Sequence, residues 1–178
     1  AGFTMNSEKI NWQVKSGVQI NNFDANATYM KENYTVNKRF ISPSVSSNFR
    51  YKIDKSKTLS ASYNYSVSDP TASQILPYER FNDPLNTYLG NENIDQTKSH
   101  AVGIGLRNYD FQMRSGWLVR LSGNYYDSQI VSSTVFDENR KRTTTYENIA
   151  DAYSAELFGN FNKSYKFDEH TIRYGVSL

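Results

Sequence analysis

The sequence predicts an all-β fold made of long strands with one apolar and one polar face, and three observations lead to this prediction. Apolar and polar residues alternate without an error from Thr58 to Ser68, and a strand places alternate side chains on opposite faces of its sheet. This segment is longer than the roughly 5–6 residues common in soluble domains. The same alternation recurs in six other segments, none of which has a helical period.

Seven strands are expected in chain order, each justified by apolar residues at every second position with polar residues or glycine between them. The apolar residues that define them are Trp12, Val14, Val18 and Ile20; Val45, Phe49, Tyr51 and Ile53; Leu59, Ala61, Tyr63, Tyr65 and Val67; Val102, Ile104 and Leu106; Trp117, Val119, Leu121 and Tyr125; Tyr153, Ala155, Leu157 and Phe161; and Ile172, Tyr174, Val176 and Leu178. Phe23–Tyr29 is a candidate for an eighth strand. The apolar face of such a sheet must meet either a protein core or lipid.

The predicted connections alternate between long and short, which favours a membrane barrel over a soluble fold. The long ones are residues 21–39, 69–97 and 128–147, and the short ones are residues 54–57, 109–115 and 163–169. Outer-membrane barrels have short periplasmic turns and longer outer loops, whereas a soluble β-sandwich has turn signals about every 8–12 residues. We therefore expect antiparallel transmembrane β-barrel strands, with a soluble β-sandwich or solenoid as an alternative. Within the last long connection, Asp137–Asn148 is expected to form a solvated hairpin tip.

Composition is compatible with this expectation and excludes several other classes. The mean hydropathy is −0.70, and no run approaches the roughly 18 apolar residues of a transmembrane helix. The strands of a membrane barrel contain no such long apolar run, because half of their residues are polar, so these values do not exclude a membrane barrel. The net charge of +2 creates no field that favours nucleic acid. The absence of cysteine excludes disulfides and thiolate chemistry.

Aromatic residues make up 15% of the chain, and several lie near the ends of predicted strands. These are Trp12, Tyr51, Trp117, Tyr125, Tyr153 and Tyr174. Such a placement is typical of aromatic girdles at a lipid–water boundary, although Tyr and Phe are also common in strands for packing reasons.

The charged residues of the predicted strands are expected to face a polar lumen, because a charge that faces lipid is costly. They are Lys15, Arg50, Lys52, Arg107, Arg120 and Glu156. On the same face, Gly103 and Gly105 either allow another backbone to approach or relieve crowding in a curved wall.

The stretch from Phe40 to Gly105 contains loop residues with a recognisable spacing. They are Asp69–Pro70, Gln74, Leu76–Pro77, Asp83–Pro84, Asn86, Gly90–Asn91 and Asn93–Ile94. In these residues the stretch resembles the barrel of a TonB-dependent outer-membrane receptor, and most closely the outer-membrane β-barrel family common in Bacteroidetes. Glu92 stands where that family has proline, and Asp95–Gln96 replaces its Lys-Pro-Glu.

The resemblance implies a barrel of about twenty-two strands around an N-terminal plug, located in the bacterial outer membrane. Residues 1–178 would then be part of a single barrel domain, a fragment without plug or signal peptide. The whole receptor would import a nutrient: its loops capture a small-molecule ligand, the plug gates the lumen, and a TonB-type energy-coupling protein acts from the periplasmic side. The charged lumen residues would touch that plug. Open sheet edges would make the chain stable only within its parent or paired to other chains.

A self-contained eight-stranded outer-membrane barrel or a surface adhesin is the alternative, with a binding role in place of transport. It would use Phe23–Tyr29 as the eighth strand. Pairing of the first strand with Ile172–Leu178 would favour this alternative, because a complete barrel has no open edges.

The loop that follows Asp69 is the expected place for ligand contacts. From Asp69 to Thr97 it carries five acidic residues against Arg80 alone, together with several aromatic residues. The candidate contact residues are Tyr78, Arg80, Asp83, Tyr88 and Asn91. The rings are suited to stacking on a ligand such as a sugar, whereas the prolines and asparagines equally predict a loop folded by turns. No spacing typical of a calcium loop is present, so no metal site is expected.

No catalytic function is expected. His100 and His170 are the only histidines, and no spacing pairs either with a nucleophile or with metal ligands. Each lies at the start of a predicted strand, at opposite ends of the wall. The many serines alternate inward as the polar lining of a barrel. We therefore expect neither a cofactor nor a metal.

Overall fold

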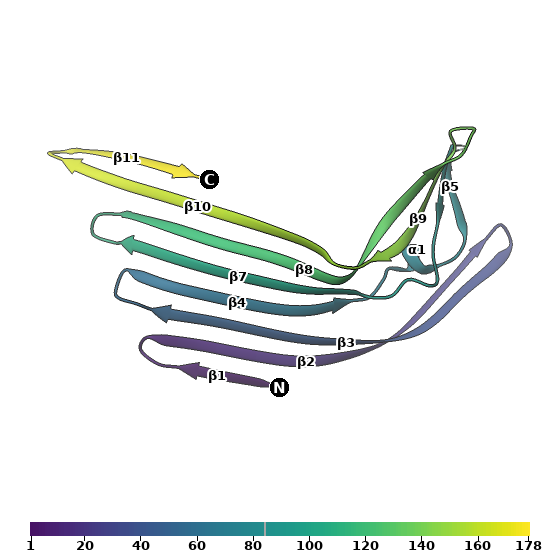
Figure 1. The fold of residues 1–178 in the computed structure, drawn as a ribbon, viewed down its shortest axis with the longest axis horizontal. Helices are drawn as coiled ribbons and strands as arrows, with labels where there is room; N and C mark the ends of the chain where they lie inside the picture. Colours follow the sequence, from purple (N-terminus) through teal and green to yellow (C-terminus); the bar gives the residue numbers. More distant parts are fainter. Residues whose placement is uncertain (84) are drawn as a thin grey trace.

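The computed structural model describes residues 1–83 and 85–178, and most of them form one β-sheet (Figure 1). Of its 11 strands, three form a side branch and the other eight lie side by side in a curved wall. In spatial order the wall strands are β1 (Gly2–Asn6), β2 (Ile10–Tyr29), β3 (Glu32–Lys52), β4 (Lys57–Ser68), β7 (Thr97–Asp110), β8 (Ser115–Phe136), β10 (Ala152–Phe167) and β11 (His170–Ser177). Each is antiparallel to its neighbours in the wall. The predicted all-β class is confirmed.

Two hairpins continue beyond the wall and bend away from it, as the right side of Figure 1 shows. One is formed by β2 and β3, whose pairing runs on to Tyr29 and Glu32. The other is formed by the second half of β8 and by β9 (Arg142–Ile149). β9 also pairs in parallel with β6 (Asn86–Leu89), which pairs with β5 (Glu79–Asp83). The wall and the side branch therefore share β8.

Short and long connections lie at opposite ends of the wall, as the sequence predicts. The short turns, at the left of Figure 1, are residues 7–9, 53–56, 111–114 and 168–169. In the second of these, the Asp54 carboxylate accepts hydrogen bonds from the backbone N–H groups of Ser56 and Lys57, at 2.7 and 2.8 Å. These bonds hold the pKa of Asp54 below its ordinary value and close the turn.

The register of the wall gives it one apolar and one polar face. One cross-strand row consists of Phe49, Ala61, Ile104, Leu121 and Leu157. The adjacent row consists of Arg50, Ser60, Gly105 and Arg120. The apolar row is uncovered, since Ile104, Leu121 and Leu157 are 57%, 53% and 57% exposed. An uncovered apolar face of this width is unfavourable in water and is suited to lipid.

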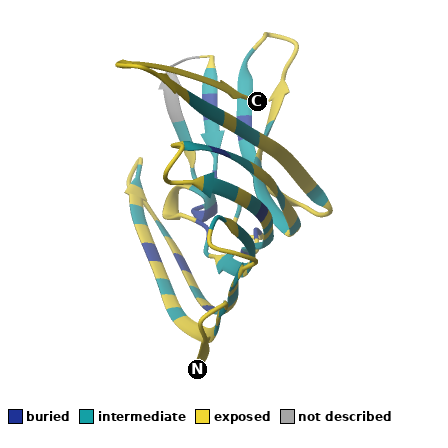
Figure 2. Ribbon diagram, turned by 90° about the vertical axis from the view of Figure 1, so that its left-hand side faces the viewer, coloured by how far each residue is buried: buried dark blue, intermediate teal, exposed yellow. Residues whose placement is uncertain are grey.

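The buried apolar residues of the described chain lie at the loop end, not within the wall. They are Ala25, Val36, Phe40, Ile75, Leu76 and Ile94. Ala25 and Val36 belong to the β2–β3 hairpin and Ile75 to the short helix α1 (Ala72–Ile75), so the hairpin packs against the loop that joins β4 to β7. Figure 2 shows buried positions in dark blue in the hairpin and around the helix. In the described part of the chain, no helix is long and apolar enough to cross a membrane.

Two of the predicted long connections are largely strand. Residues 21–39 continue β2 and β3 as a hairpin closed by Met30 and Lys31, both with positive φ. Phe23–Tyr29 therefore belongs to β2 and is not a separate strand. Residues 128–147 likewise complete β8 and most of β9, so the hairpin tip is limited to residues 137–141. The loop predictions were wrong because the alanines and polar residues of these segments make the alternation weak. The separate strand at Phe23–Tyr29 was wrong because alternation does not distinguish a hairpin extension from a wall strand.

The eighth wall strand is β1, whose five residues are too few for the alternation to be distinctive. β1 pairs only with β2, and β11 at the other edge pairs only with β10, so the sheet is open. Among the described residues, the first strand does not pair with Ile172–Leu178, as a self-contained barrel would require. The open sheet is evidence against the eight-stranded alternative.

Candidate functional site

A half-buried polar network anchors the loop between β4 and β7 to the β2–β3 hairpin. The Asp69 carboxylate accepts hydrogen bonds from Asn21 Nδ2 at 2.8 Å, from Ser42 Oγ at 3.2 Å and from Gln96 Nε2 at 2.7 Å. Partial burial opposes ionisation of Asp69, but the three hydrogen bonds outweigh this effect and hold its pKa below the ordinary value. Since Asp69 and Gln96 lie at the two ends of the loop, the network fixes both ends to the same hairpin.

This network predicts a pH-dependent opening of the loop. Because the pKa of Asp69 is lowered by folding, its stabilising effect is present above the ordinary pKa of aspartate, about 3.9, and is lost as the pH falls through the lowered value. We expect hydrogen exchange of residues 72–96, corrected for intrinsic rates, to accelerate below about pH 4. Asp69→Asn should already exchange on the order of tenfold faster at neutral pH, because hydrogen bonds to a charged group are worth about 1.5–3 kcal/mol. An identical acid response in both proteins would contradict this assignment.

Gly90 and Asn91 hold the same loop together from inside. Gly90 lies against the backbone of Leu76, and a Cβ at this position would lie 1.9 Å from the Leu76 carbonyl oxygen. The Asn91 backbone N–H donates to the Gln74 carbonyl at 2.8 Å, and Asn91 Nδ2 donates to the Tyr146 carbonyl at 2.8 Å. The Gly-Asn pair of the receptor-like motif therefore connects α1 to β9.

Tyr78 and Arg80, two of the predicted contact residues, lie together in an aromatic cluster beside the β2–β3 hairpin. The Tyr78 ring centroid is 5.4 Å from that of Tyr29 and 5.3 Å from that of Tyr34. The Arg80 guanidinium lies 5.9 Å from the Tyr78 ring centroid and donates to the Ser73 carbonyl at 2.9 Å. The three tyrosines and the arginine are all partly exposed. Three rings and one cation form a surface on which a flat or polyhydroxylated ligand can stack.

The other predicted contact residues lie elsewhere. Tyr88 Oη accepts a hydrogen bond from Arg142 Nη2 of β9 at 3.2 Å. Asn91 makes the contacts with α1 and β9 described above, and the Asp83 side chain lies outside the described residues. The structure therefore brings Tyr78 and Arg80 together and gives Tyr88 and Asn91 partners on β9. Ligand contact by any of the five stays a prediction.

Tyr29 and Tyr34, which complete the aromatic cluster, are not recognisable from the sequence as partners of Tyr78. They fall in residues 21–39, which the sequence predicts to be a loop. The available signal is an alternation of Phe23 and Ala25 with polar residues that leads up to Tyr29. Small alanines make that signal weak, although the hairpin buries Ala25.

His100 has partners that its sequence spacing does not reveal. Its Nδ1 lies 2.8 Å from Tyr63 Oη, and its Nε2 lies 3.0 Å from Asp127 Oδ2. Its ring centroid is 4.7 Å from that of Tyr65. This cluster lies on the apolar face toward the loop end of the wall. Among the residues that the structure describes, no group of three or more histidine, aspartate or glutamate side chains could hold a metal ion.

Aromatic side chains border the apolar face at both ends. Those toward the turns are Trp12, Tyr51 and Trp117, and those toward the loops are Tyr63, Tyr65, Tyr125 and Tyr153. Amphipathic rings at these two levels are suited to the two lipid–water boundaries. An antiparallel wall with such a face, with short turns at one end and folded loops at the other, defines a transmembrane β-barrel of the outer-membrane type.

The model of the outer membrane protein beta-barrel family matches residues 1–171, and the chain belongs to this family. It is therefore located in the bacterial outer membrane, where its apolar face meets the membrane lipid. No curated protein matches the chain.

Proposed function

We propose that this chain forms barrel wall and extracellular loops of a TonB-dependent transporter that takes up a small-molecule nutrient. One observation carries the proposal: the residues by which the chain resembles such a receptor are those that fold the loop between β4 and β7. Asp69 fixes the loop to the hairpin, and Gln74, Gly90 and Asn91 join α1 to the rest of it. A loop anchored in this way on a rigid wall is suited to positioning ligand contacts.

The openness of the sheet supports a large barrel within this proposal. Eight strands are enough to close a small barrel whose interior side chains fill it, yet here the eight wall strands leave the sheet open. We propose that further strands complete a barrel of about twenty-two and that residues 1–178 are one part of its single barrel domain. A plug and a TonB-type energy-coupling protein would act with it, and its role would be transport and not catalysis.

Tyr78 and Arg80 are the primary ligand contacts in this proposal, with Tyr29 and Tyr34 from the hairpin beside them. These side chains come from two segments that the buried core holds together. Asp83, Tyr88 and Asn91 are secondary candidates on the same loop.

The test is uptake of labelled candidate nutrients by cells that display the full-length protein. Uptake should be lost when the TonB-type energy-coupling protein is deleted. Tyr78→Ala/Arg80→Ala should lower uptake about tenfold or more, because ring stacking and a cation are removed together. Lys31→Gln, at the tip of the β2–β3 hairpin, should leave uptake unchanged. Uptake that continues without the energy-coupling protein would identify a passive pore, and binding without uptake would favour an adhesin.

A further inference from the structure

A hollow of about 270 Å³, here called the rim hollow, lies at the turn end of the wall. The pairing of β10 with β8 ends at Asn162 and Gly116, whereas β10 and β11 pair on to Phe167 and His170. The β10–β11 hairpin therefore projects beyond the turn between β7 and β8, as the left side of Figure 1 shows. The lining of the hollow comes from both sides of this notch and consists of Tyr109, Arg114, Asn162, Lys163, Ser164, Arg173 and Tyr174.

Two hydrogen bonds fix the β7–β8 turn against the hairpin. The backbone N–H of Ser164 donates to Ser115 Oγ at 3.0 Å, and Ser164 Oγ donates to the Arg114 carbonyl at 3.3 Å. Arg114 lies in this turn with a positive φ of 46°, yet its backbone is held beside β10. The turn and the hairpin therefore form one unit around the hollow.

The charged side chains that line the rim hollow are all positive. They are Arg114, Lys163 and Arg173, and none of the described lining residues is acidic. In the part of the chain that the structure describes, none of these three cations has a carboxylate oxygen within 4.0 Å. Clustered charge without a counter-charge favours an anionic ligand.

The carboxylates of the two nearest wall turns are engaged within their own turns. The Asp110 carboxylate accepts hydrogen bonds from the backbone N–H groups of Gln112 and Met113 at 2.8 and 3.0 Å. The Asp54 carboxylate of the neighbouring turn closes that turn, as described above. Neither group is therefore a counter-ion of the hollow.

The acidic residues of the β10–β11 hairpin lie further along its strands. Asp168 and Glu169 form the turn beyond Phe167 and His170, about 10 Å or more along the strands from the lining residues Ser164 and Arg173. Glu156 lies toward the middle of the wall, about 20 Å along β10 from Asn162. The charge next to the hollow is therefore positive on both sides of the notch.

The donors around the hollow are suited to a phosphate group. A guanidinium fork binds two phosphate oxygens at once, and Arg114 and Arg173 supply two such forks. Ser164 and Asn162, which are half-buried, add a hydroxyl and an amide. The volume is about nine times the roughly 30 Å³ that one water takes up in the liquid, which leaves room for a phosphate and its ester substituent.

The position of the hollow favours a lipid as the source of this phosphate. Lys163 belongs to the side of β10 that carries Phe161, the cross-strand partner of Trp117, and this is the apolar side of the wall. Lys163 Nζ lies 4.7 Å from the Tyr165 ring centroid, and the Tyr165 and Tyr174 centroids are 6.1 Å apart. Aromatic rings with a lysine among them are typical of the level of lipid head groups. Short turns lie on the periplasmic side of such barrels, so this is the periplasmic leaflet.

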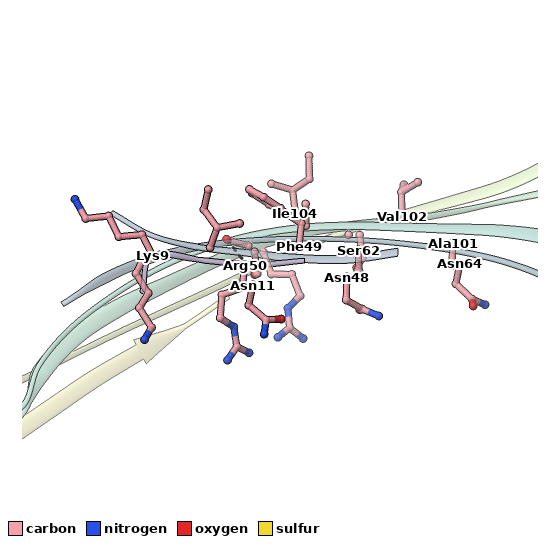
Figure 3. A pocket seen from close by; sticks show the side chains of 18 of the residues that line it. Lys9, Asn11, Asn48, Phe49, Arg50, Ser62, Asn64, Ala101, Val102 and Ile104 are labelled. Atoms are coloured by element: carbon pink, nitrogen blue, oxygen red, sulfur yellow. Dashed lines mark hydrogen bonds between the residues drawn. The ribbon is translucent and has the colours of Figure 1, made fainter. Parts of the chain in front are cut away.

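A larger hollow of about 820 Å³ on the polar face differs in both respects. Figure 3 shows its residues Arg50 and Asn48 projecting from one side of the sheet, opposite to the apolar side chains. Glu156 lies on the same face, cross-strand from the lining residue Ser122, so a carboxylate accompanies these cations. This hollow faces the lumen and not the lipid. The rim hollow alone combines uniform positive charge with access from the apolar side.

We propose that the rim hollow binds the phosphate group of an anionic phospholipid from the periplasmic leaflet of the outer membrane. Arg114 and Arg173 bind the phosphate oxygens, and Lys163 adds a third positive charge from the apolar side. The acyl chains lie along the apolar face beside Phe161. This inference goes beyond the proposed transport function and does not depend on it.

The test is native mass spectrometry of the full-length protein from detergent micelles that contain equal amounts of phosphatidylglycerol and phosphatidylcholine. Both lipids contain a phosphate, but only phosphatidylglycerol has a net negative charge, because choline is a cation. Phosphatidylglycerol adducts should exceed phosphatidylcholine adducts about tenfold, because each cation near a membrane surface favours an anionic lipid by about 1 kcal/mol. Arg114→Gln/Arg173→Gln should abolish this preference.

Lys9→Gln/Lys55→Gln is the matched control for this variant. It removes two positive charges from other short turns at the same end of the wall, and neither residue lines the rim hollow. The preference should be retained in this control. The electrophoretic shift on heating, which reports a folded wall, should be preserved in both double variants.

Equal adducts of the two lipids on the native protein would overturn the proposal, and this comparison needs no variant to fold. A preference that survives Arg114→Gln/Arg173→Gln, or one that is also lost in Lys9→Gln/Lys55→Gln, would overturn the assignment to the rim hollow. Glycerol 1-phosphate added at the concentration of the lipid distinguishes the source of the phosphate. If it displaces phosphatidylglycerol, a soluble phosphate ester is the preferred ligand and the assignment to lipid is wrong.

Discussion

Gly90→Val should open the loop between β4 and β7 while leaving the barrel wall intact. A Cβ at position 90 would lie 1.9 Å from the carbonyl oxygen of Leu76 and 2.7 Å from its carbonyl carbon. Both are backbone atoms, so no rotamer change relieves the contact and the loop must separate from α1. Separation exposes Ile75 and Ile94, which are 0% and 2% exposed in the native fold. We expect a local cost of about 3 kcal/mol or more, measured as faster proteolytic cleavage within residues 72–96.

Gly159→Val is the matched control for this experiment. The nearest atom to a Cβ at position 159 is the Cβ of Leu178 at 4.0 Å, which is an ordinary contact. Cleavage within residues 72–96 should therefore stay at the native rate in Gly159→Val. The electrophoretic shift on heating, which reports a folded wall, should be preserved in both variants. A native cleavage rate in Gly90→Val would show that the loop does not depend on the close packing of Gly90 against Leu76.

The two faces of the wall could be predicted from the sequence because they depend on a local period. Leu59 and Ser60 are assigned to opposite faces by position alone, and the register confirms this by pairing Leu59 with Leu106 and Ser60 with Gly105. The bend that separates the wall from its hairpin extensions could not be predicted in the same way. β2 alternates on both sides of that bend, and only the buried partners of Ala25 distinguish the extension.

The candidate site shows the same division between local and long-range information. The spacing of Gly90 and Asn91 identifies a motif, but the sequence does not reveal that Gly90 touches Leu76 or that Asn91 donates to Tyr146. The cluster around Tyr78 is likewise completed by a hairpin far upstream in the chain. Such contacts depend on how the loop folds back on the hairpin, and no periodic pattern encodes that path.

Leu121→Arg should prevent stable insertion of the wall, and Ser122→Arg on the same strand should not. Leu121 lies on the apolar face between Ile104 and Leu157, and all three are more than half exposed, so an arginine here would enter lipid. Near the bilayer midplane this costs about 2–4 kcal/mol. Ser122 faces the lumen in the adjacent row beside Glu156, where an added cation stays in water next to an opposite charge.

The measurement that compares the two variants is the midpoint of urea unfolding in lipid vesicles for the full-length protein. A lower midpoint for Leu121→Arg than for Ser122→Arg is expected because only Leu121→Arg places the added charge on the apolar side of the sheet. Equal midpoints, or the reverse order, would mean that the exposed apolar face of this sheet does not contact lipid.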